Sequence, residues 1–504
     1  MADTSLSSLF WSKSSVRPEI AAALALLGLL VIARLTLRTY RIHGHPLKSF
    51  KGPPEACVPE DWLYKVTKDG TAEQKFEALH KKYNTKALRI GPNELHISDI
   101  ELYKVIYKQS KPFLKHAPFY DGFNTPHTVF AEIDPRLHKE RRRMLNPLFS
   151  KVGVYKLEPL IHEKIYVLSS KINRLCGSQE IDIYNAVRLL TTEIITEFAF
   201  ARSANLIEER TEEMDSWFLD AFDVGSQSVV DLQYNYFLRQ LVRILPVGIS
   251  ELLNPKLASI LNLQKFAADC MRHWQKSSGS SSHPVIFDSL KSISDSAKVS
   301  EAMDILIAGA DTTASTLTTG FYHILSNPTI QKRLVRALDE AMPESGSLIS
   351  LQSLEKVEYL SACVKESIRV GMAVPGRLPR VVPNGDPFVV EGKLVPPGTI
   401  VGMSAYTMHN SIDAWGPDAR EFNPDRWIGP ESKDLEKWLC TFSKGARMCL
   451  GQNVAPAEMT LTFAHLFRNH ELSLPKGNMA PKGIDRFTLQ FEKPGLPVVF
   501  KPRQ

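Results

Sequence analysis

One cysteine in this chain stands where a metal could bind its thiolate. Cys449 follows a turn at Gly445, with Arg447 two residues before it and Gly451 two residues after it, and a helical pattern begins beyond. The dipole and unpaired N–H groups of a helix N-terminus favour an anion, so they help to keep a thiol deprotonated. Arg447 can hold an anionic group beside the sulfur. This spacing suits one thiolate ligand on a metal, and thiolate is one of the axial ligands of haem iron.

The whole stretch from Phe442 to Gly451 resembles the haem-ligand loop of the cytochrome P450 family, Phe-x-x-Gly-x-Arg-x-Cys-x-Gly, with every fixed position filled. The resemblance extends from about Pro53 to the C-terminus. It implies a mostly α fold with a small β-rich part, built around haem b. It also implies that Cys449 is the axial ligand of the iron and that Phe442, Arg447 and Gly451 shape the cofactor site. A buried structural cysteine in a loop is the alternative.

A second group of residues lies in the stretch 300–326, which is mostly apolar, contains no proline and predicts a long helix. Its segment 308–313, Ala-Gly-Ala-Asp-Thr-Thr, has low helix propensity, and a threonine hydroxyl can bond back to the i−4 carbonyl and open the helix locally. The segment resembles the family's oxygen-activation motif. That resemblance implies that Ala308 faces the haem and that Asp311 and Thr312 relay protons to the oxygen. Close helix packing through small residues is the alternative.

Basic side chains are expected to bind the two carboxylates of the haem. His138 and Arg142 are four residues apart in a predicted helix and therefore share a face. The family usually has tryptophan where His138 stands. By its position after Arg369, Arg380 resembles the family's propionate-binding arginine, and Arg447 is the other; a guanidinium suits a carboxylate well. A solvated basic helix face and a surface arginine are the alternatives.

Glu366 and Arg369 share a helical face, and Arg426 follows them within the sequence Phe-Asn-Pro-Asp-Arg-Trp. The resemblance implies that these three residues form a buried ion-pair network that holds the segment beside the haem. Such a network fixes geometry even where its net stabilisation is small. The family's usual Pro-Glu-Arg-Phe is here Pro-Asp-Arg-Trp, so we expect different packing around Arg426.

The elements that must position these residues are mostly helices. Asn327 and Pro328 are predicted to end the long helix and begin the next one. Another helix is predicted over 353–370, and the segment 113–130 is predicted to be an aromatic loop. Pro456 falls where the family has a continuous helix, so we expect that helix to bend. Strands are predicted at 87–90, 94–97, 388–390 and 399–404.

Composition excludes several other classes of protein. With 504 residues, of which 43% are apolar and 23% charged, the chain can build a large core. The net charge of +6 is mild, and the basic run at 141–143 lacks the interleaved aromatic residues of a base-stacking groove, so no nucleic-acid partner is indicated. The six cysteines form no Cys-x-x-Cys pair, which argues against zinc and disulfide frameworks.

The N-terminal region predicts a membrane anchor. Residues 1–19 form a flank, 20–37 a transmembrane helix, 38–59 a linker containing Pro and Gly, and 60–504 the haem-thiolate domain. More arginines follow the apolar run than precede it, which places the body on the cytosolic side of the endoplasmic reticulum membrane. A cleaved signal peptide is the alternative. The amphipathic stretch 237–245 packs in the core or touches the membrane.

Together these features resemble a microsomal-type monooxygenase that inserts one oxygen atom from O2 into an apolar small molecule. Electrons would come from NADPH through a partner reductase, because the sequence has no flavin- or dinucleotide-binding segment. Segments 113–130 and 374–378 are expected to line the pocket. The sequence resembles fungal secondary-metabolism members, with a terpenoid, meroterpenoid or polyketide substrate. The alternatives are an isomerase or dehydratase that needs no reductase, and a non-enzymatic membrane-tethered lipid carrier.

Overall fold

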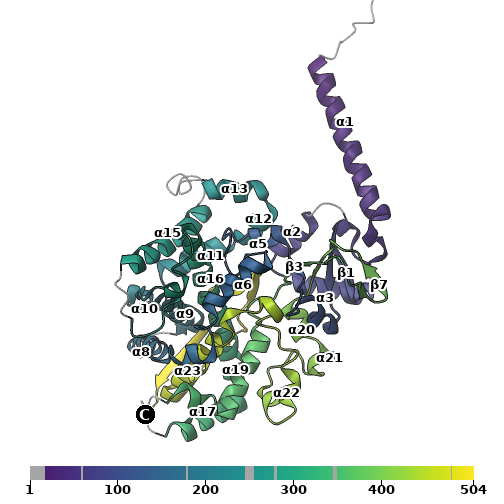
Figure 1. Ribbon diagram of the computed structural model, residues 1–504. Coiled ribbons are helices and arrows are strands. Elements are labelled where there is room, and N and C mark those ends of the chain that lie inside the picture. The colour runs from purple at the N-terminus through teal and green to yellow at the C-terminus, as the bar shows by residue number, and fades with distance from the viewer. Residues whose placement is uncertain are drawn as a thin grey trace, which may run out of the picture.

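Long helices form most of the body, and α16 (Asp295–Ser326) runs through its middle (Figure 1). The computed structural model describes residues 18–57, 61–177, 180–244, 255–276, 281–343, 349–477 and 479–503. The other helices are α1 (Pro18–Thr39), α2 (Asp61–Lys68), α3 (Ala72–Tyr83), α4 (Tyr103–Ile106), α5 (Ala117–Asp121), α6 (Pro135–Leu145), α7 (Lys151–Tyr155), α8 (Glu158–Leu175), α9 (Ile183–Phe200), α10 (Leu206–Glu209), α11 (Trp217–Ser226), α12 (Val229–Tyr234), α13 (Tyr236–Ile244), α15 (Pro255–Lys276), α17 (Pro328–Ala341), α18 (Leu351–Leu354), α19 (Glu358–Gly371), α20 (Ala405–His409), α21 (Ile412–Trp415), α22 (Ser432–Leu435) and α23 (Val454–Asn469).

The strands form small sheets at the margins of this helical body. They are β1 (Ala87–Gly91), β2 (Glu94–Ile97), β3 (Leu114–Lys115), β4 (Ile181–Asp182), β5 (Arg380–Val381), β6 (Phe388–Val390), β7 (Lys393–Val395), β8 (Ile400–Gly402), β9 (His470–Ser473), β10 (Gly483–Arg486), β11 (Thr488–Phe491) and β12 (Pro497–Pro502). The largest sheet has the order β1-β2-β8-β5-β3, and the others are β4-β12-β9, β6-β7 and β10-β11. The prediction of a mostly α fold with a small β-rich part is confirmed.

The main hydrophobic core lies where α8, α9, α16, α19 and α23 meet. Aromatic rings join these helices: Phe321 of α16 lies 5.0 Å from Phe463 and 5.5 Å from Phe467 of α23, measured between ring centroids. The side chain of Ser294 accepts a hydrogen bond from the Ala297 N–H and caps α16, and Asn327 caps α17 as the sequence predicts. Helix α16 is thus capped at its start and packed against α23 along one face.

Three predicted elements differ from the structure. The helix predicted over 353–370 is two helices, because Val357 is extended and separates α18 from α19. The segment 113–130 contains β3 and α5 as well as loop. Pro456 does not bend its helix: α23 begins at Val454, so the proline lies in the first turn, where the N–H it lacks has no partner within the helix. α23 therefore runs unbroken to Asn469.

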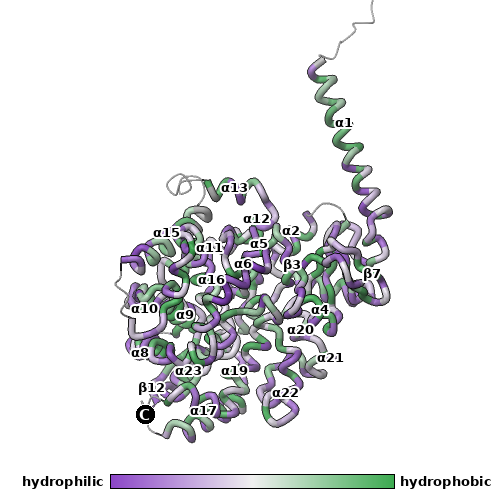
Figure 2. Tube along the Cα trace, viewed as in Figure 1, coloured by the Kyte–Doolittle hydropathy of each residue, from purple (hydrophilic) through white to green (hydrophobic). Residues whose placement is uncertain are grey.

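The N-terminal helix α1 extends away from the body (Figure 1) and is apolar along most of its length (Figure 2). Its 22 residues span about 33 Å at 1.5 Å per residue, close to the thickness of a bilayer core. Over residues 19–44 the chain is long and apolar enough to cross a membrane, and it is the one such candidate in the part of the chain that the structure describes. Residues 1–17 of the predicted flank lie outside the described residues.

Candidate active site

The loop from Phe442 to Gly451 is folded tightly around its cysteine. The backbone N–H of Cys449 donates to the carbonyl oxygen of Phe442 at 2.8 Å, which closes the loop. Gly445 has a φ of +72°, and a Cβ there would lie 2.5 Å from the carbonyl oxygen of Tyr107. Only glycine accepts both conditions, so the turn and its close approach to the end of α4 depend on that residue.

Cys449 is surrounded by protein and is still accessible. Burial raises its pKa, whereas a hydrogen bond from the Gly451 N–H and the charge of Arg142 act in the opposite direction. The residue is nevertheless exposed, whereas its neighbours in the loop are only partly exposed. The side chain therefore keeps surface that a ligand could contact. Its position and its donors suit a metal-bound thiolate.

Three arginines lie beside this loop. Arg447 donates to the carbonyl oxygens of Glu132 and Ile133 at 2.6 and 2.8 Å, and burial and the charge of Arg380 lower its pKa to about 10. Arg142 of α6 donates to the carbonyl oxygen of Met448. Arg380 of β5 donates to the hydroxyl of Tyr120 and to the carbonyl oxygen of Pro379. All three guanidinium groups are held by neutral oxygens.

A fourth cation, Lys115, was missed by the sequence analysis. Strand β3 pairs antiparallel with β5, which places Lys115 directly opposite Arg380. Like charges in that position repel each other. Lys115 is buried and donates to the carbonyl oxygen of Phe130; burial together with Arg380 and Arg447 keeps its pKa well below the usual value. His138 is also buried, and burial with the neighbouring charge of Arg447 lowers its pKa to about 3, so it is neutral.

Few carboxylates lie close to this cluster. Within the described ranges no carboxylate pairs directly with Lys115, Arg142, Arg380 or Arg447, although Asp304 acts electrostatically on Lys115, and Glu132 and Asp134 act on Arg447. Clustered cations repel one another, and a bound anion relieves that repulsion. Haem carries two carboxylates and an iron that accepts a thiolate. The residues around Cys449 therefore fit haem. The closeness of Lys115 to Arg380 could not be predicted from the sequence, because it depends on the pairing of β3 with β5.

Helix α16 presents a second part of the site. Ala308 is exposed and Thr312 is partly exposed, although most residues around them on α16 are buried. The Thr312 hydroxyl donates to the Ala308 carbonyl oxygen at 2.8 Å, as the sequence suggested, and yet α16 stays continuous, so the expected local opening is absent from this helix. On a neighbouring side of the helix, a Cβ on Gly309 would lie 2.4 Å from Ile195 of α9. Close packing therefore accounts for Gly309.

Asp311 does not share the open face with Thr312. Its side chain is buried and faces α9 and β11, where it pairs with the Arg188 guanidinium at 3.0 Å. The hydroxyls of Tyr184 and Thr488 also donate to it, at 3.2 and 3.0 Å. Burial raises the pKa of Asp311, and Arg188 opposes that shift. The acid and the alcohol predicted to act together thus lie on different sides of α16.

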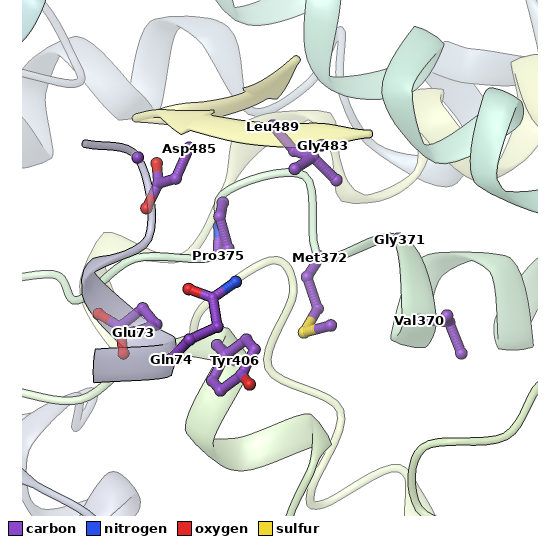
Figure 3. A pocket seen from close by; sticks show the side chains of 11 residues that line it. Glu73, Gln74, Val370, Gly371, Met372, Pro375, Tyr406, Gly483, Asp485 and Leu489 are labelled. Carbon is purple, nitrogen blue, oxygen red and sulfur yellow. The ribbon is translucent and has the colours of Figure 1, made fainter. Parts of the chain in front are cut away.

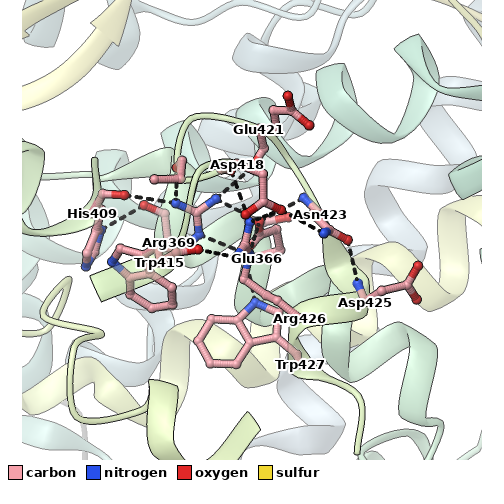
Figure 4. A network of polar contacts seen from close by, with 12 residues as sticks. Glu366, Arg369, His409, Trp415, Asp418, Glu421, Asn423, Asp425, Arg426 and Trp427 are labelled. Carbon is pink, nitrogen blue, oxygen red and sulfur yellow. Dashed lines mark hydrogen bonds and ion pairs between the residues drawn. The ribbon is translucent and has the colours of Figure 1, made fainter. Parts of the chain in front are cut away.

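The structure joins Glu366, Arg369 and Arg426 (Figure 4). Glu366 Oε1 lies 2.8 Å from Arg369 and 3.0 Å from Arg426. Arg369 also donates to the carbonyl oxygens of His409 and Ala419, which lie before the cysteine loop. The indole N–H of Trp427 donates to Glu366 Oε2 at 2.8 Å, a contact that the family's phenylalanine could not make. This contact is the packing difference expected around Arg426.

A separate small pocket lies between α3, the end of α19 and the β10–β11 hairpin (Figure 3). Gln74, Met372 and Asp485 are among its lining residues, and none of the lining belongs to the cysteine loop. Burial raises the pKa of Asp485 to about 7, although the Phe487 N–H donates to its carboxylate at 2.8 Å. The Leu489 N–H donates to the Ala373 carbonyl oxygen at 2.9 Å, so the hairpin is fastened to the segment after α19.

Comparisons with known proteins agree with this geometry. The family profile described as Cytochrome P450 matches residues 59–498. Cytochrome P450 monooxygenase MO6277 of Ascocoryne sarcoides is 31% identical over 90% of this chain and 92% of its own length. Cytochrome P450 monooxygenase sdnE of Sordaria araneosa is 30% identical over 90% of this chain and 96% of its own. The solved haem domain of cytochrome P450DA covers 90% of this chain and 98% of its own with a TM-score of 0.74 and 18% identity, a likeness of fold.

Proposed function

This chain belongs to the cytochrome P450 family, and from that premise we propose that it is a monooxygenase that inserts one oxygen atom from O2 into an apolar small molecule. The observation that carries the proposal is the exposed Cys449 in its tight loop, beside arginines that form no direct ion pair with a carboxylate in the described ranges. Haem b, when bound, supplies a thiolate-ligated iron that activates O2. Cys449 would supply the thiolate that holds the iron.

The other residues bind the cofactor and move protons. Arg142, Arg380 and Arg447 would hold the haem carboxylates, and neutral His138 lies near Arg447 and Arg142. Ala308 leaves room on the open face of α16, because a larger side chain would fill that space. The Thr312 hydroxyl stands on the same face and positions a proton for the oxygen. Asp311 supplies that proton from the other side of the helix.

Electrons would reach the site from NADPH through a separate cytochrome P450 reductase. Lys444 lies on the cysteine side and donates to the Glu436 carbonyl oxygen, so its charge is not paired there. A basic side chain near the thiolate suits an acidic redox partner, since opposite charges steer association. We place the body on the cytosolic face of the endoplasmic reticulum membrane, with α1 as a single-pass anchor.

The substrate is proposed to be an apolar secondary metabolite of terpenoid, meroterpenoid or polyketide type. Aromatic rings from the segment 113–130 and from the β10–β11 turn gather into one cluster: Phe123 lies 5.0 Å from Phe130 and 4.5 Å from Phe487 between ring centroids. Rings of this kind favour an apolar ligand. The fungal monooxygenases among the relatives support the assignment to secondary metabolism.

The test is the fate of NADPH in the purified protein with a reductase and candidate substrates. Replacing Thr312 by Ala should leave haem binding and reduction intact, while NADPH is consumed, peroxide is released and product falls. Positioned proton transfer contributes about 10²–10⁴-fold, so the loss of product should be large. An unchanged product-to-NADPH ratio would contradict the role of Thr312. Product formed by the wild type without NADPH or O2 would identify a rearrangement enzyme, and a colourless protein would identify a lipid carrier.

A further inference from the structure

Arg188 of α9 lies between two carboxylates from different helices. Its Nε is 3.0 Å from Asp311 of α16, and its terminal nitrogen is 2.7 Å from Asp223 of α11. The side chains of Arg188 and Asp311 are 2% and 1% exposed, whereas Asp223 is 30% exposed. The guanidinium also stacks on the rings of Tyr184 and Phe222. The three charged groups form a row that leads from the core towards solvent.

The chemistry of arginine sets what this row can do. A guanidinium keeps its proton in proteins, so Arg188 cannot pass a proton along and always needs a counter-ion. Removing one partner from a buried ion pair is strongly destabilising, because the other charge is left uncompensated. With one cation and two carboxyl groups, one carboxylate suffices to balance Arg188. The other carboxyl group is then free to take up a proton.

The two carboxyl groups differ in position. Asp311 sits one residue from Thr312 in α16 and receives hydroxyl donors from Tyr184 and Thr488 as well as from Arg188. Its carboxyl group must leave Arg188 before it can serve the open face of the helix. Asp223 stays on Arg188 when that happens. Asp223 belongs to α11, whose Ser226 hydroxyl donates to Gln490 of β11 at 3.0 Å.

We propose that Asp223 is a positioning residue that balances the charge of Arg188 while Asp311 takes up and releases protons. This inference rests on the proposed monooxygenase function. The proposal makes the supply of protons depend on the position of α11, because α11 carries the carboxylate that balances Arg188 when Asp311 leaves the ion pair. Burial and the charge of Asp223 raise the pKa of Asp311, while the charge of Arg188 lowers it. These opposing effects agree with the placement of Arg188 between the two carboxyl groups.

The test begins with Asp223→Asn in the full-length holoenzyme. Arg188 then has Asp311 as its one carboxylate, and Asp311 stays ionised. Product formation at neutral pH should fall about tenfold for each unit by which the pKa of Asp311 drops. The loss should diminish as the pH is lowered, and the solvent deuterium isotope effect should grow. The product-to-NADPH ratio should hold, in contrast to Thr312→Ala, because protons become scarce and are not misdirected.

Matched variants separate positioning from mere structure. Asp220→Asn lies one turn earlier on α11, where Asp220 pairs with Arg210 at 2.9 Å, and it should leave the rate and the pH profile unchanged. Asp223→Glu keeps a carboxylate on Arg188 and should retain most of the rate. Adding Arg188→Gln to Asp223→Asn removes the cation that holds Asp311, so the double variant should recover part of the lost rate. A structural role would make the double variant worse.

The outcomes decide between two failures. If the wild type forms no NADPH-dependent product with any candidate substrate, the proposed function fails. If the wild type turns over and Asp223→Asn keeps the rate, pH profile and isotope effect of Asp220→Asn, the function stands and the role of Asp223 is overturned. The spectrum of the reduced carbonyl complex and the haem content, measured on every variant, show whether the fold is kept. A slow Asp223→Asn enzyme whose pH profile does not move also overturns the proposal.

Discussion

Two cysteines lie nine residues apart near the haem loop, and their surroundings differ sharply. Cys440 is buried, burial raises its pKa to about 12, and its backbone N–H donates to His409. Cys449 has open surface, a donor from Gly451 and a nearby arginine. The local surroundings, more than the residue type, therefore decide which sulfur serves as a ligand.

Replacing Cys449 by Ala should abolish the thiolate-type spectrum of the reduced carbonyl complex, because Cys449 is the one cysteine in the loop from Phe442 to Gly451. Replacing Cys440 by Ala should leave that spectrum intact. The measurement is the difference spectrum of the two purified variants beside the wild type. Loss of the spectrum in the Cys440 variant, with its retention in the Cys449 variant, would reverse the assignment.

Lys115 provides a prediction that the sequence alone did not offer. Lys115→Met should speed the loss of haem, because a buried cation opposite Arg380 is no longer there to bind a carboxylate. A hydrogen bond to a charged group contributes about 1.5–3 kcal/mol, so haem should leave about 10- to 100-fold faster. The measurement is haem transfer to an excess of an apoprotein acceptor. Lys104→Met, at an exposed lysine paired with Glu101, is the control, and equal rates in both variants would contradict this role.

At the scale of residues, the sequence predicted the contacts between side chains that lie close together in the chain. The cysteine loop, Glu366 with Arg369, and Ala308 with Thr312 are local patterns, and the structure places each set together. The sequence analysis missed Lys115, because its role depends on a pairing between strands far apart in the chain. The direction of the Asp311 side chain could not be predicted from the sequence either, because helical spacing does not show which neighbouring element a side chain contacts.

At the scale of elements, boundaries were harder to predict than identity. The apolar period of 353–370 continues through the break at Val357, so periodicity alone joined α18 to α19. Pro456 suggested a bend, because the start of α23 could not be placed to within one turn. The short strand β3 lacks any period of its own and owes its existence to pairing with β5.

The β10–β11 hairpin carries a prediction about pH. Burial raises the pKa of Asp485 to about 7, well above its value in an unfolded chain. Such a group stabilises the fold fully below its unfolded pKa, and that stabilisation is lost as the pH rises through about 7. Asp485→Asn removes the titration, so the variant should gain stability relative to the wild type between pH 4 and pH 7. Each unit of pKa shift is worth about 1.4 kcal/mol.

Unfolding midpoints of the wild type and Asp485→Asn, measured from pH 4 to pH 8, check this. The carbonyl oxygen that asparagine keeps can still accept the Phe487 N–H, so the hairpin turn is preserved. The curves should diverge as the pH rises and run parallel above about pH 7. Parallel curves over the whole range would show that the carboxyl group titrates alike in the folded and unfolded chains.

At the scale of the whole molecule, two exposed apolar surfaces lie outside the core. Helix α1 extends from the body, and α13 exposes Phe237 and Ile244 to 84% and 77%. Val242 and Arg239 of α13 are both buried, so the helix does not pack its predicted apolar face as a whole into the core; Arg239 turns inward and donates to the Leu232 carbonyl oxygen at 3.1 Å. Leu245 lies outside the described residues. Exposed apolar surface of this extent indicates contact with a membrane or a partner.

Deleting residues 1–38 separates these two surfaces. The deletion removes nearly all of α1, so salt-resistant membrane retention should fall strongly, while the haem spectrum and turnover in detergent should stay, because no residue near Cys449 belongs to that segment. A second variant, Phe237→Ser with Ile244→Ser, should leave the full-length protein in the membrane. Partial retention that is lost only when both changes are combined would assign a share of the binding to α13, since a buried apolar surface contributes about 25 cal/mol per Å². Full retention after the deletion alone would show that α1 is not the anchor.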